Sequence, residues 1–137
     1  MRGAGVRLSL AAIAAGVLAL GWAGAFAATL AQQVSSEHGV TVRVTPRDLA
    51  PAAKAWDFDM VLETHSQDLT DDLKAEASLV ADGAKQPPRA WQGPPPGGHH
   101  RTGVLSFAPV TPRPETIELR LLRPGESSPR SFRWTLK

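Results

Sequence analysis

Three histidines carry the most distinctive chemistry in this sequence. They are His65 and the adjacent pair His99 and His100, which follows three prolines and two glycines. Neutral imidazole is the commonest protein ligand for zinc and copper, and three nitrogen ligands with one open position make a familiar metal site. Glu63 and Asp68 lie near His65 in the sequence and could supply an oxygen ligand or orient an imidazole ring. The sequence therefore predicts a site for a divalent metal, copper or zinc.

The spacing of the histidines leaves alternatives open. Adjacent residues of an extended chain point to opposite faces, so a smaller site would use His65 with only one of His99 and His100. The rings could instead pack on Trp91, hydrogen-bond to backbone and carboxylates, or recognise a small molecule or a partner. Arg101 follows the pair and could clamp an anion, or pair with a nearby carboxylate such as that of Asp68.

Other chemistry is excluded by residues that the chain lacks. There is no cysteine, so disulfides, thiolate metal sites and blue-copper electron transfer are ruled out. Met60 is the only internal methionine, which excludes a methionine cluster for Cu(I). Ser66 beside His65 and Asp68 has the residue types of a hydrolase, but chain neighbours rarely meet in triad geometry and no nucleophile elbow is present. We expect no enzymatic activity.

The segment before the histidine pair is built to place it. Pro94, Pro95 and Pro96 favour an extended polyproline rod, and the two glycines that follow allow a sharp bend. This pattern predicts a loop that stands clear of the sheet and bends back at His99.

The elements that must position these residues are short strands. Val40–Val44, Trp56–Thr64, Thr116–Leu121 and Ser131–Leu136 alternate apolar and polar side chains, as half-buried strands do. Further strands are expected at 77–80 and 103–107, and a helical turn near Thr70. About seven short strands without room for βαβ crossovers predict an all-β, antiparallel β-sandwich of immunoglobulin-like or cupredoxin-like shape. Its core or rim should hold three of the four tryptophans, Trp56, Trp91 and Trp134.

The beginning of the chain predicts export. Arg2 and Arg7 precede an apolar run, and Ala25-Phe26-Ala27 is a small-x-small cleavage pattern. Residues 1–27 are therefore expected to be a signal peptide or, because the run is long enough to span a bilayer, a helical membrane anchor. We expect a tether at 28–39 and the β-sandwich domain at 40–137, outside the cytoplasm in either case. Arg2 and Arg7 are two of the 15 basic residues, so the remaining 13 match the 13 acidic ones and nothing indicates a nucleic-acid partner.

The chain also resembles an uncharacterised family of prokaryotic exported or membrane-anchored β-domains. The resemblance covers most of Val40 to Leu136 and rests on a Thr-His-Ser segment at 64–66 and a proline-rich Gly-Gly-His-His-Arg loop at 97–101. It implies that His65, His99, His100 and Arg101 act as one constellation, and it implies no activity.

Two functions follow as expectations. The first is an exported accessory protein or carrier that binds copper or zinc through the histidine cluster. The second is a module without metal, which docks an envelope protein partner through its proline-rich loop.

Overall fold

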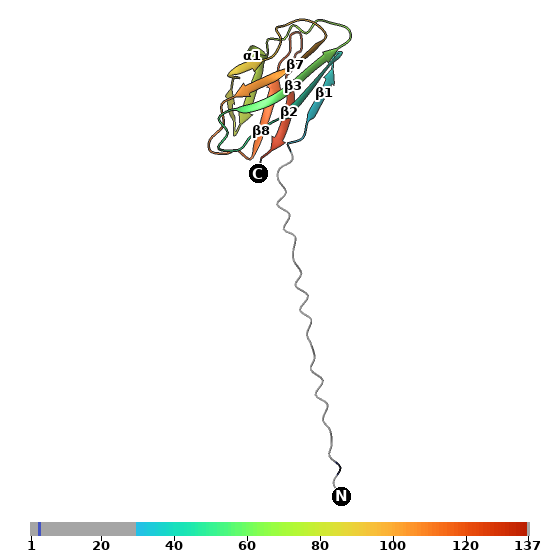
Figure 1. Ribbon diagram of the computed structural model, residues 1–137. Helices are drawn as coiled ribbons and strands as arrows, with labels where there is room; N and C mark the ends of the chain where they lie inside the picture. Colours follow the sequence, from blue (N-terminus) through green and yellow to red (C-terminus); the bar gives the residue numbers. More distant parts are fainter. Residues whose placement is uncertain (1–2, 4–29, 137) are drawn as a thin grey trace.

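The computed structural model describes residue 3 and residues 30–136 (Figure 1). The predicted signal or anchor segment, 1–27, lies outside the described residues apart from Gly3, and so does the start of the predicted tether. No helix in the described part of the chain has the length and apolar character needed to cross a membrane.

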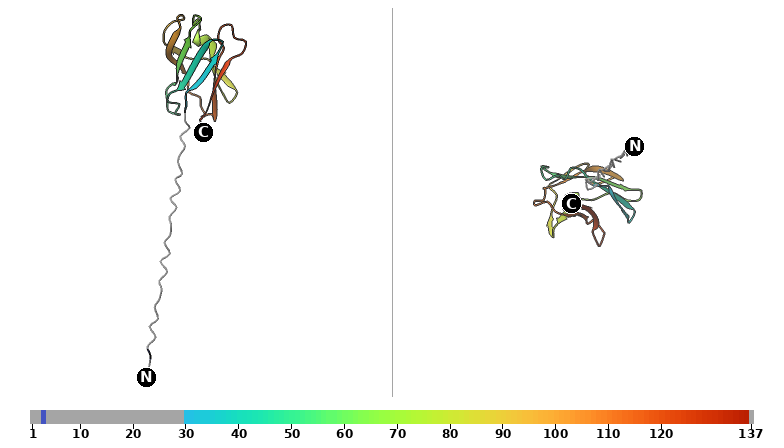
Figure 2. Two further views of the ribbon diagram at one scale, coloured as in Figure 1. Left: turned by 90° about the vertical axis from the view of Figure 1, so that its right-hand side faces the viewer. Right: turned by 90° about the horizontal axis from the view of Figure 1, so that it is seen from below.

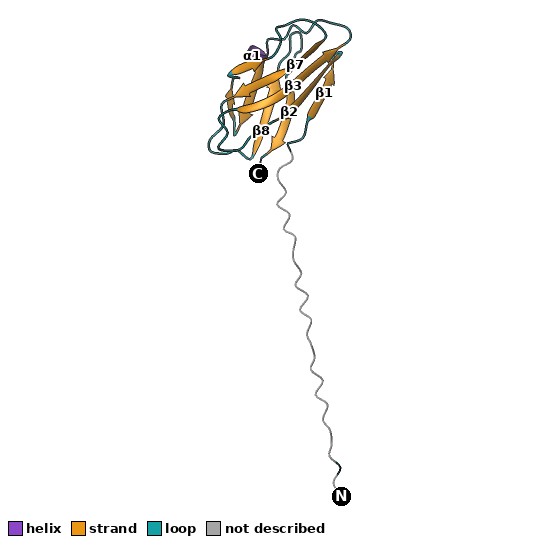
Figure 3. Ribbon diagram, in the orientation of Figure 1, coloured by secondary structure: helices purple, strands orange, loops and turns teal. Residues whose placement is uncertain are grey.

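Residues 30–136 form two antiparallel sheets (Figures 1 and 3). The first sheet has the order β1-β2-β3-β7-β6 and the second has the order β5-β4-β8-β9. The strands of the first sheet are β1 (Gln33–Glu37), β2 (Val40–Pro46), β3 (Trp56–Thr64), β6 (Ala90–Gln92) and β7 (His100–Phe107). Those of the second sheet are β4 (Ala77–Ala81), β5 (Ala84–Gln86), β8 (Thr116–Leu121) and β9 (Arg130–Thr135). The predicted all-β antiparallel sandwich is confirmed.

The core follows from the alternation of side chains along the strands. In β3 every second residue from Trp56 to Thr64 is buried, and β2, β8 and β9 bury the facing apolar residues in the same rhythm. Phe58 lies at the centre, with its ring 5.7 Å from that of Phe107 in edge-to-face contact and 5.6 Å from that of Trp134 in the other sheet. Each such side chain contributes about 1.5–3 kcal/mol by burial, so these rings join the two layers, which Figure 2 shows from below.

One boundary of the domain prediction is wrong. Residues 33–37, expected within the tether, form β1 and pair with β2 from Gln33↔Val44 to Glu37↔Val40. This strand lacks an apolar alternation because both of its faces are largely exposed. Tertiary contacts hold it instead: the side-chain amide of Gln33 bonds to the backbone N–H and C=O of Arg133, bridging β1 to the edge of β9.

The sandwich has two unlike ends (Figure 1). At one end the C-terminal strand finishes, and the indole N–H of Trp134 donates to the carbonyl of Ala31, where the described part begins (2.8 Å). The opposite end, which we name the loop end, consists of residues 38–39, 65–72, 93–99 and 122–129. The short helix α1 (Leu73–Glu76) borders the loop end and leads directly into β4, as the sequence predicts.

Candidate functional site at the loop end

Three of the four histidines of the chain lie in the loop end and the fourth, His100, directly adjoins it; all four are exposed. His38 is in the turn between β1 and β2, His65 directly follows β3, and His99 and His100 stand at the start of β7. The fold therefore gathers residues that are 62 positions apart in sequence onto one end of the molecule, since 38 and 100 mark the first and last of them.

The end of β3 does lie beside the glycine hinge. The backbone N–H of Thr64 donates to the carbonyl of His99 (3.0 Å), and Glu63 pairs with His100 in the strand register. The Nδ1 atom of His100 is 3.4 Å from Glu63 Oε1, and its Nε2 atom is 2.9 Å from the hydroxyl of Thr102. Both ring nitrogens of His100 therefore already have protein partners.

Glu63 is also held by Arg43. The guanidinium of Arg43 binds its carboxylate, and this hydrogen bond lowers the pKa of Glu63 below its ordinary value. Glu63 thus lies beside His100 within a partly exposed ion pair, and its role as an accessory carboxylate at a metal site stays a prediction.

The three predicted ligands do not form a three-ligand group. Within residues 30–136, the group of three side chains with ligand atoms all within 4.8 Å of one another is Glu37, His38 and Glu126. That group contains none of His65, His99 and His100. Metal binding by this protein stays a prediction.

The Glu37, His38 and Glu126 group is poorly suited to a cation. Both oxygens of Glu126 accept hydrogen bonds from Arg130, and Oε2 also accepts one from Arg123 (2.9–3.1 Å). Burial opposes ionisation of Glu126, but the two guanidinium groups outweigh it and hold the pKa of Glu126 below its usual range. A metal ion would have to displace or approach two fixed positive charges.

The proline loop does not stand clear of the domain. Gly97 N–H donates to the carbonyl of Leu69 (2.7 Å), and Leu69 N–H donates back to the carbonyl of Gly98 (2.9 Å). The glycines adopt φ angles of 125° and 76°, which only glycine takes readily, and this bend lets the loop lie along the segment after β3. The expectation of a projecting loop is wrong because these backbone groups find partners in each other.

Arg101 fixes the other side of the loop. It faces inward on β7 and is only 2% exposed. Its Nη1 atom donates to the carbonyl of Asp71 (2.7 Å) and its Nη2 atom to the carbonyl of Pro94 (3.0 Å), while the guanidinium lies 5.6 Å from the centre of the Trp91 ring. Asp68 is exposed and does not pair with it. Arg101 is therefore a structural clamp and is not available to bind an anion from solvent.

Trp91 completes this clamp. Its indole N–H donates to the carbonyl of Pro94 (3.1 Å), and its ring occupies the space left by two glycines. A Cβ atom on Gly93 would lie 2.5 Å from the ring, and one on Gly103 would lie 2.5 Å from the carbonyl oxygen of Gln92 and 2.6 Å from the ring. The sequence signals for this packing are the tryptophan and the two glycines, but their contact needs the β6–β7 register to be known.

A network of buried charges lies beneath the loops, and the sequence did not reveal it. The carboxylate of Asp71, 0% exposed, takes two hydrogen bonds from Arg123 (2.8 and 3.0 Å), and Arg123 also binds Glu126. Arg130 in turn binds Glu126 and caps backbone carbonyls of the first hairpin. Those carbonyls belong to Ser35, Glu37 and Val40.

Glu76, the last residue of α1, adjoins this network. Its Oε1 atom accepts the backbone N–H of Asp72 (3.0 Å), whereas its Oε2 atom is buried without a hydrogen-bond partner. Burial raises the pKa of Glu76 to about 7; the bond from Asp72 opposes this, and the adjoining Asp71 carboxyl group reinforces it.

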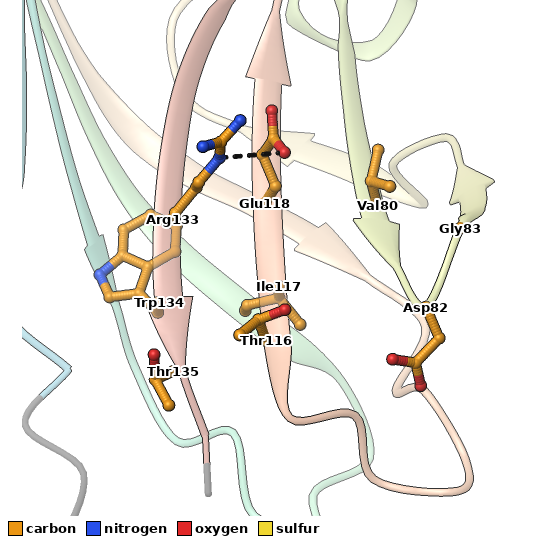
Figure 4. A pocket seen from close by; sticks show the side chains of 9 residues that line it. All are labelled: Val80, Asp82, Gly83, Thr116, Ile117, Glu118, Arg133, Trp134 and Thr135. Atoms are coloured by element: carbon orange, nitrogen blue, oxygen red, sulfur yellow. Dashed lines mark ion pairs between the residues drawn. The ribbon is translucent and has the colours of Figure 1, made fainter.

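A hollow lies elsewhere, on the outer face of the second sheet (Figure 4). It measures about 500 Å³, and Val80, Glu118 and Arg133 are among its lining residues. Glu118 is already bound by Arg120 and Arg133, and the hydrogen bond from Arg120 lowers its pKa to about 2. This hollow is open and its central charge is satisfied, so it offers little to a ligand.

No family profile, curated protein or solved structure matches this chain. The family resemblance seen in the sequence therefore remains a prediction, and the function must be inferred from the loop end itself.

Proposed function

We propose that this chain is an exported β-sandwich module that docks an envelope protein partner through the proline loop at its loop end. The observation that supports this proposal is that the backbone of the proline loop is fixed by hydrogen bonds while its proline side chains are exposed. Pro94, Pro95 and Pro96 are exposed, while hydrogen bonds to Trp91, Arg101 and Leu69 hold the loop in place.

A loop of this kind suits recognition by a protein. Its conformational entropy is already lost on folding, so little more is lost when a partner binds. Exposed proline rings in an extended segment pack well against aromatic side chains, as in grooves that bind proline-rich peptides. We therefore expect the partner to present exposed tryptophan or tyrosine side chains to Pro95 and Pro96.

The position of the loop supports the same function. The described part of the chain begins at the end of the sandwich opposite the loops, where Ala31 bonds to Trp134. If residues 1–27 export or anchor the chain, as their sequence predicts, the loop end points away from the attachment point. That orientation leaves the proline loop accessible to another envelope protein.

The test is crosslinking of the full chain in envelope extracts, with Pro95→Ser/Pro96→Ser compared with Pro51→Ser. Pro51 is exposed and lies outside the loop end, so its variant is the matched control. We expect one crosslinked partner that the double variant loses and the control keeps. Equal crosslinking of all three proteins would overturn the proposal.

Binding of copper or zinc is the second candidate. The ligand atoms of Glu37, His38 and Glu126 lie within 4.8 Å of one another, and the remaining histidines share the same end. Calorimetric titration of each metal into wild type, His38→Ala, and His65→Ala/His99→Ala would locate any site. Affinity lost only in His38→Ala assigns the new group, affinity lost only in the double variant assigns the predicted cluster, and no heat in wild type rejects both.

A further inference from the structure

Two carboxyl groups lie beneath the loop end: that of Asp71 is fully buried, and that of Glu76 is half-buried. Asp71 receives two bonds from Arg123, but Glu76 Oε2 has no donor at all. A charged Glu76 would hold an oxygen atom that is buried without a donor, and the nearby Asp71 carboxyl group repels that charge. The lack of a donor at Oε2 therefore favours the neutral form of Glu76, which can act as a donor toward Asp71.

The surroundings of Glu76 supply few compensating charges. Arg123 faces the pair, but it also binds Glu126. Lys74 lies on the same helix, and Lys85 of β5 lines a hollow of about 230 Å³ beside Glu76. This hollow is open, so it gives the carboxyl group a path for proton exchange with solvent.

The carboxyl pair is connected directly to the proline loop. The carbonyl of Asp71 accepts the bond from Arg101, and the same guanidinium holds Pro94. Two residues earlier, Leu69 exchanges two backbone hydrogen bonds with the glycine hinge. Any displacement of the Asp71 segment therefore acts on both attachments of the loop.

We propose that Glu76 is a proton-controlled latch: its neutral carboxyl group holds the Asp71 segment and the proline loop in place, and its ionisation loosens both. The latch rests on the described geometry, and its importance for docking rests on the proposed function. A loop end that is firm in mildly acidic surroundings and looser in alkaline ones would make partner binding depend on pH.

The sign of the effect follows from linkage. Glu76 titrates at about 7 in the folded protein, above the ordinary value of 4.5 that it regains when exposed. The folded state therefore binds the extra proton between these values, so the stabilisation is complete below about pH 4.5 and is lost as the pH rises through about 7.

The experiment measures amide hydrogen-exchange protection of Leu69 and Gly97 in the full chain at pH 5.5 and 8.5. We expect protection to fall about tenfold or more in wild type, since one pKa unit corresponds to a factor of ten. In Glu76→Gln, which stays neutral and can still donate to Asp71, protection should not change with pH. Glu115→Gln is the control, because Glu115 is exposed and lies far from the pair in sequence, and it should behave like wild type.

Two results would overturn the latch: protection in wild type that does not change with pH, or an equal fall in Glu76→Gln. A direct carbon-13 titration of the Glu76 carboxyl group in wild type needs no variant to fold, and a midpoint below pH 5 also rejects the proposal. No partner enters these measurements, so their failure is distinguishable from failure of the docking proposal.

Discussion

Two sets of ion pairs in this small domain have opposite surroundings. On the outer face of β3, Asp59 pairs with Arg47, and the two side chains are 44% and 52% exposed. Beneath the loop end, Asp71 pairs with Arg123, and those side chains are 0% and 4% exposed. Water and salt screen the first pair, whereas nothing but the protein neutralises the second.

The comparison explains how the loop end can be both polar and rigid. Buried charges are costly unless every one has a partner, and each partner must then stay in a fixed geometry. The network of Asp71, Arg123, Glu126 and Arg130 thereby fixes the loops that carry it. The ion pairs on the outer face of β3 need no fixed geometry, because water solvates their charges. They contribute more to solubility than to stability.

The largest expected effect comes from removing a buried partner. Arg123→Met leaves the Asp71 carboxylate without its two hydrogen bonds, and we expect the free energy of unfolding to fall by about 3–5 kcal/mol. Urea denaturation of the full chain measures this change. A loss no greater than that of an exposed arginine variant would show that the network is dispensable.

The next largest loss of stability is expected when the contacts of Arg101 are removed. Arg101→Met leaves the buried carbonyl of Asp71 without a donor and leaves the carbonyl of Pro94 with the Trp91 indole as its remaining donor, at a cost of about 2–4 kcal/mol in unfolding free energy. Arg101→Lys should recover only part of this loss, since one ammonium group lacks the planar fork that reaches both carbonyls. Full recovery by lysine would mean that charge alone, and not the fork, holds the loop.

Packing around Trp91 should matter somewhat less. Gly103→Ala places a Cβ atom 2.5 Å from the Gln92 carbonyl and 2.6 Å from the indole, so we expect a loss of about 1–3 kcal/mol by the same denaturation assay. A double-mutant cycle with Trp91→Ala sharpens the test. The loss should shrink, though not vanish, when the ring is absent, because the clash with the backbone remains.

The smallest effect should come from the exposed face. Arg47→Ala removes the partner of Asp59, and we expect no measurable change in the denaturation midpoint at physiological salt. The hydrogen bonds of this pair raise the pKa of Arg47 above its already high value, so its charge is constant over the accessible pH range. If Arg47→Ala lowered the denaturation midpoint as much as Arg123→Met does, the exposed and the buried ion pairs would not differ in their contribution to stability.

Much of this fold could be predicted from local sequence pattern. The alternation in Trp56–Thr64 gives a strand with one buried face, and the fold places its polar residues outward as expected. The sequence also predicted a helical turn near Thr70 and the strand after it; the structure places the helix at Leu73–Glu76, with Asp72 as its N-cap. The strand β1 was not predictable, since its polar residues gain their stability from contacts with β2, β9 and Arg130.

Some features of the candidate site could also be predicted from the sequence, and others could not. By itself, the sequence determined that His65, His99 and His100 would be near the ends of strands, and that prolines and glycines would condition the loop between them. Only the tertiary structure decided that Arg101 points inward, that the predicted histidines form no three-ligand group among the described residues, and that Asp71 meets Arg123 across 52 residues. The physical reason is that periodicity fixes which face of a strand a residue occupies, whereas the stacking of two sheets fixes which charges meet between them.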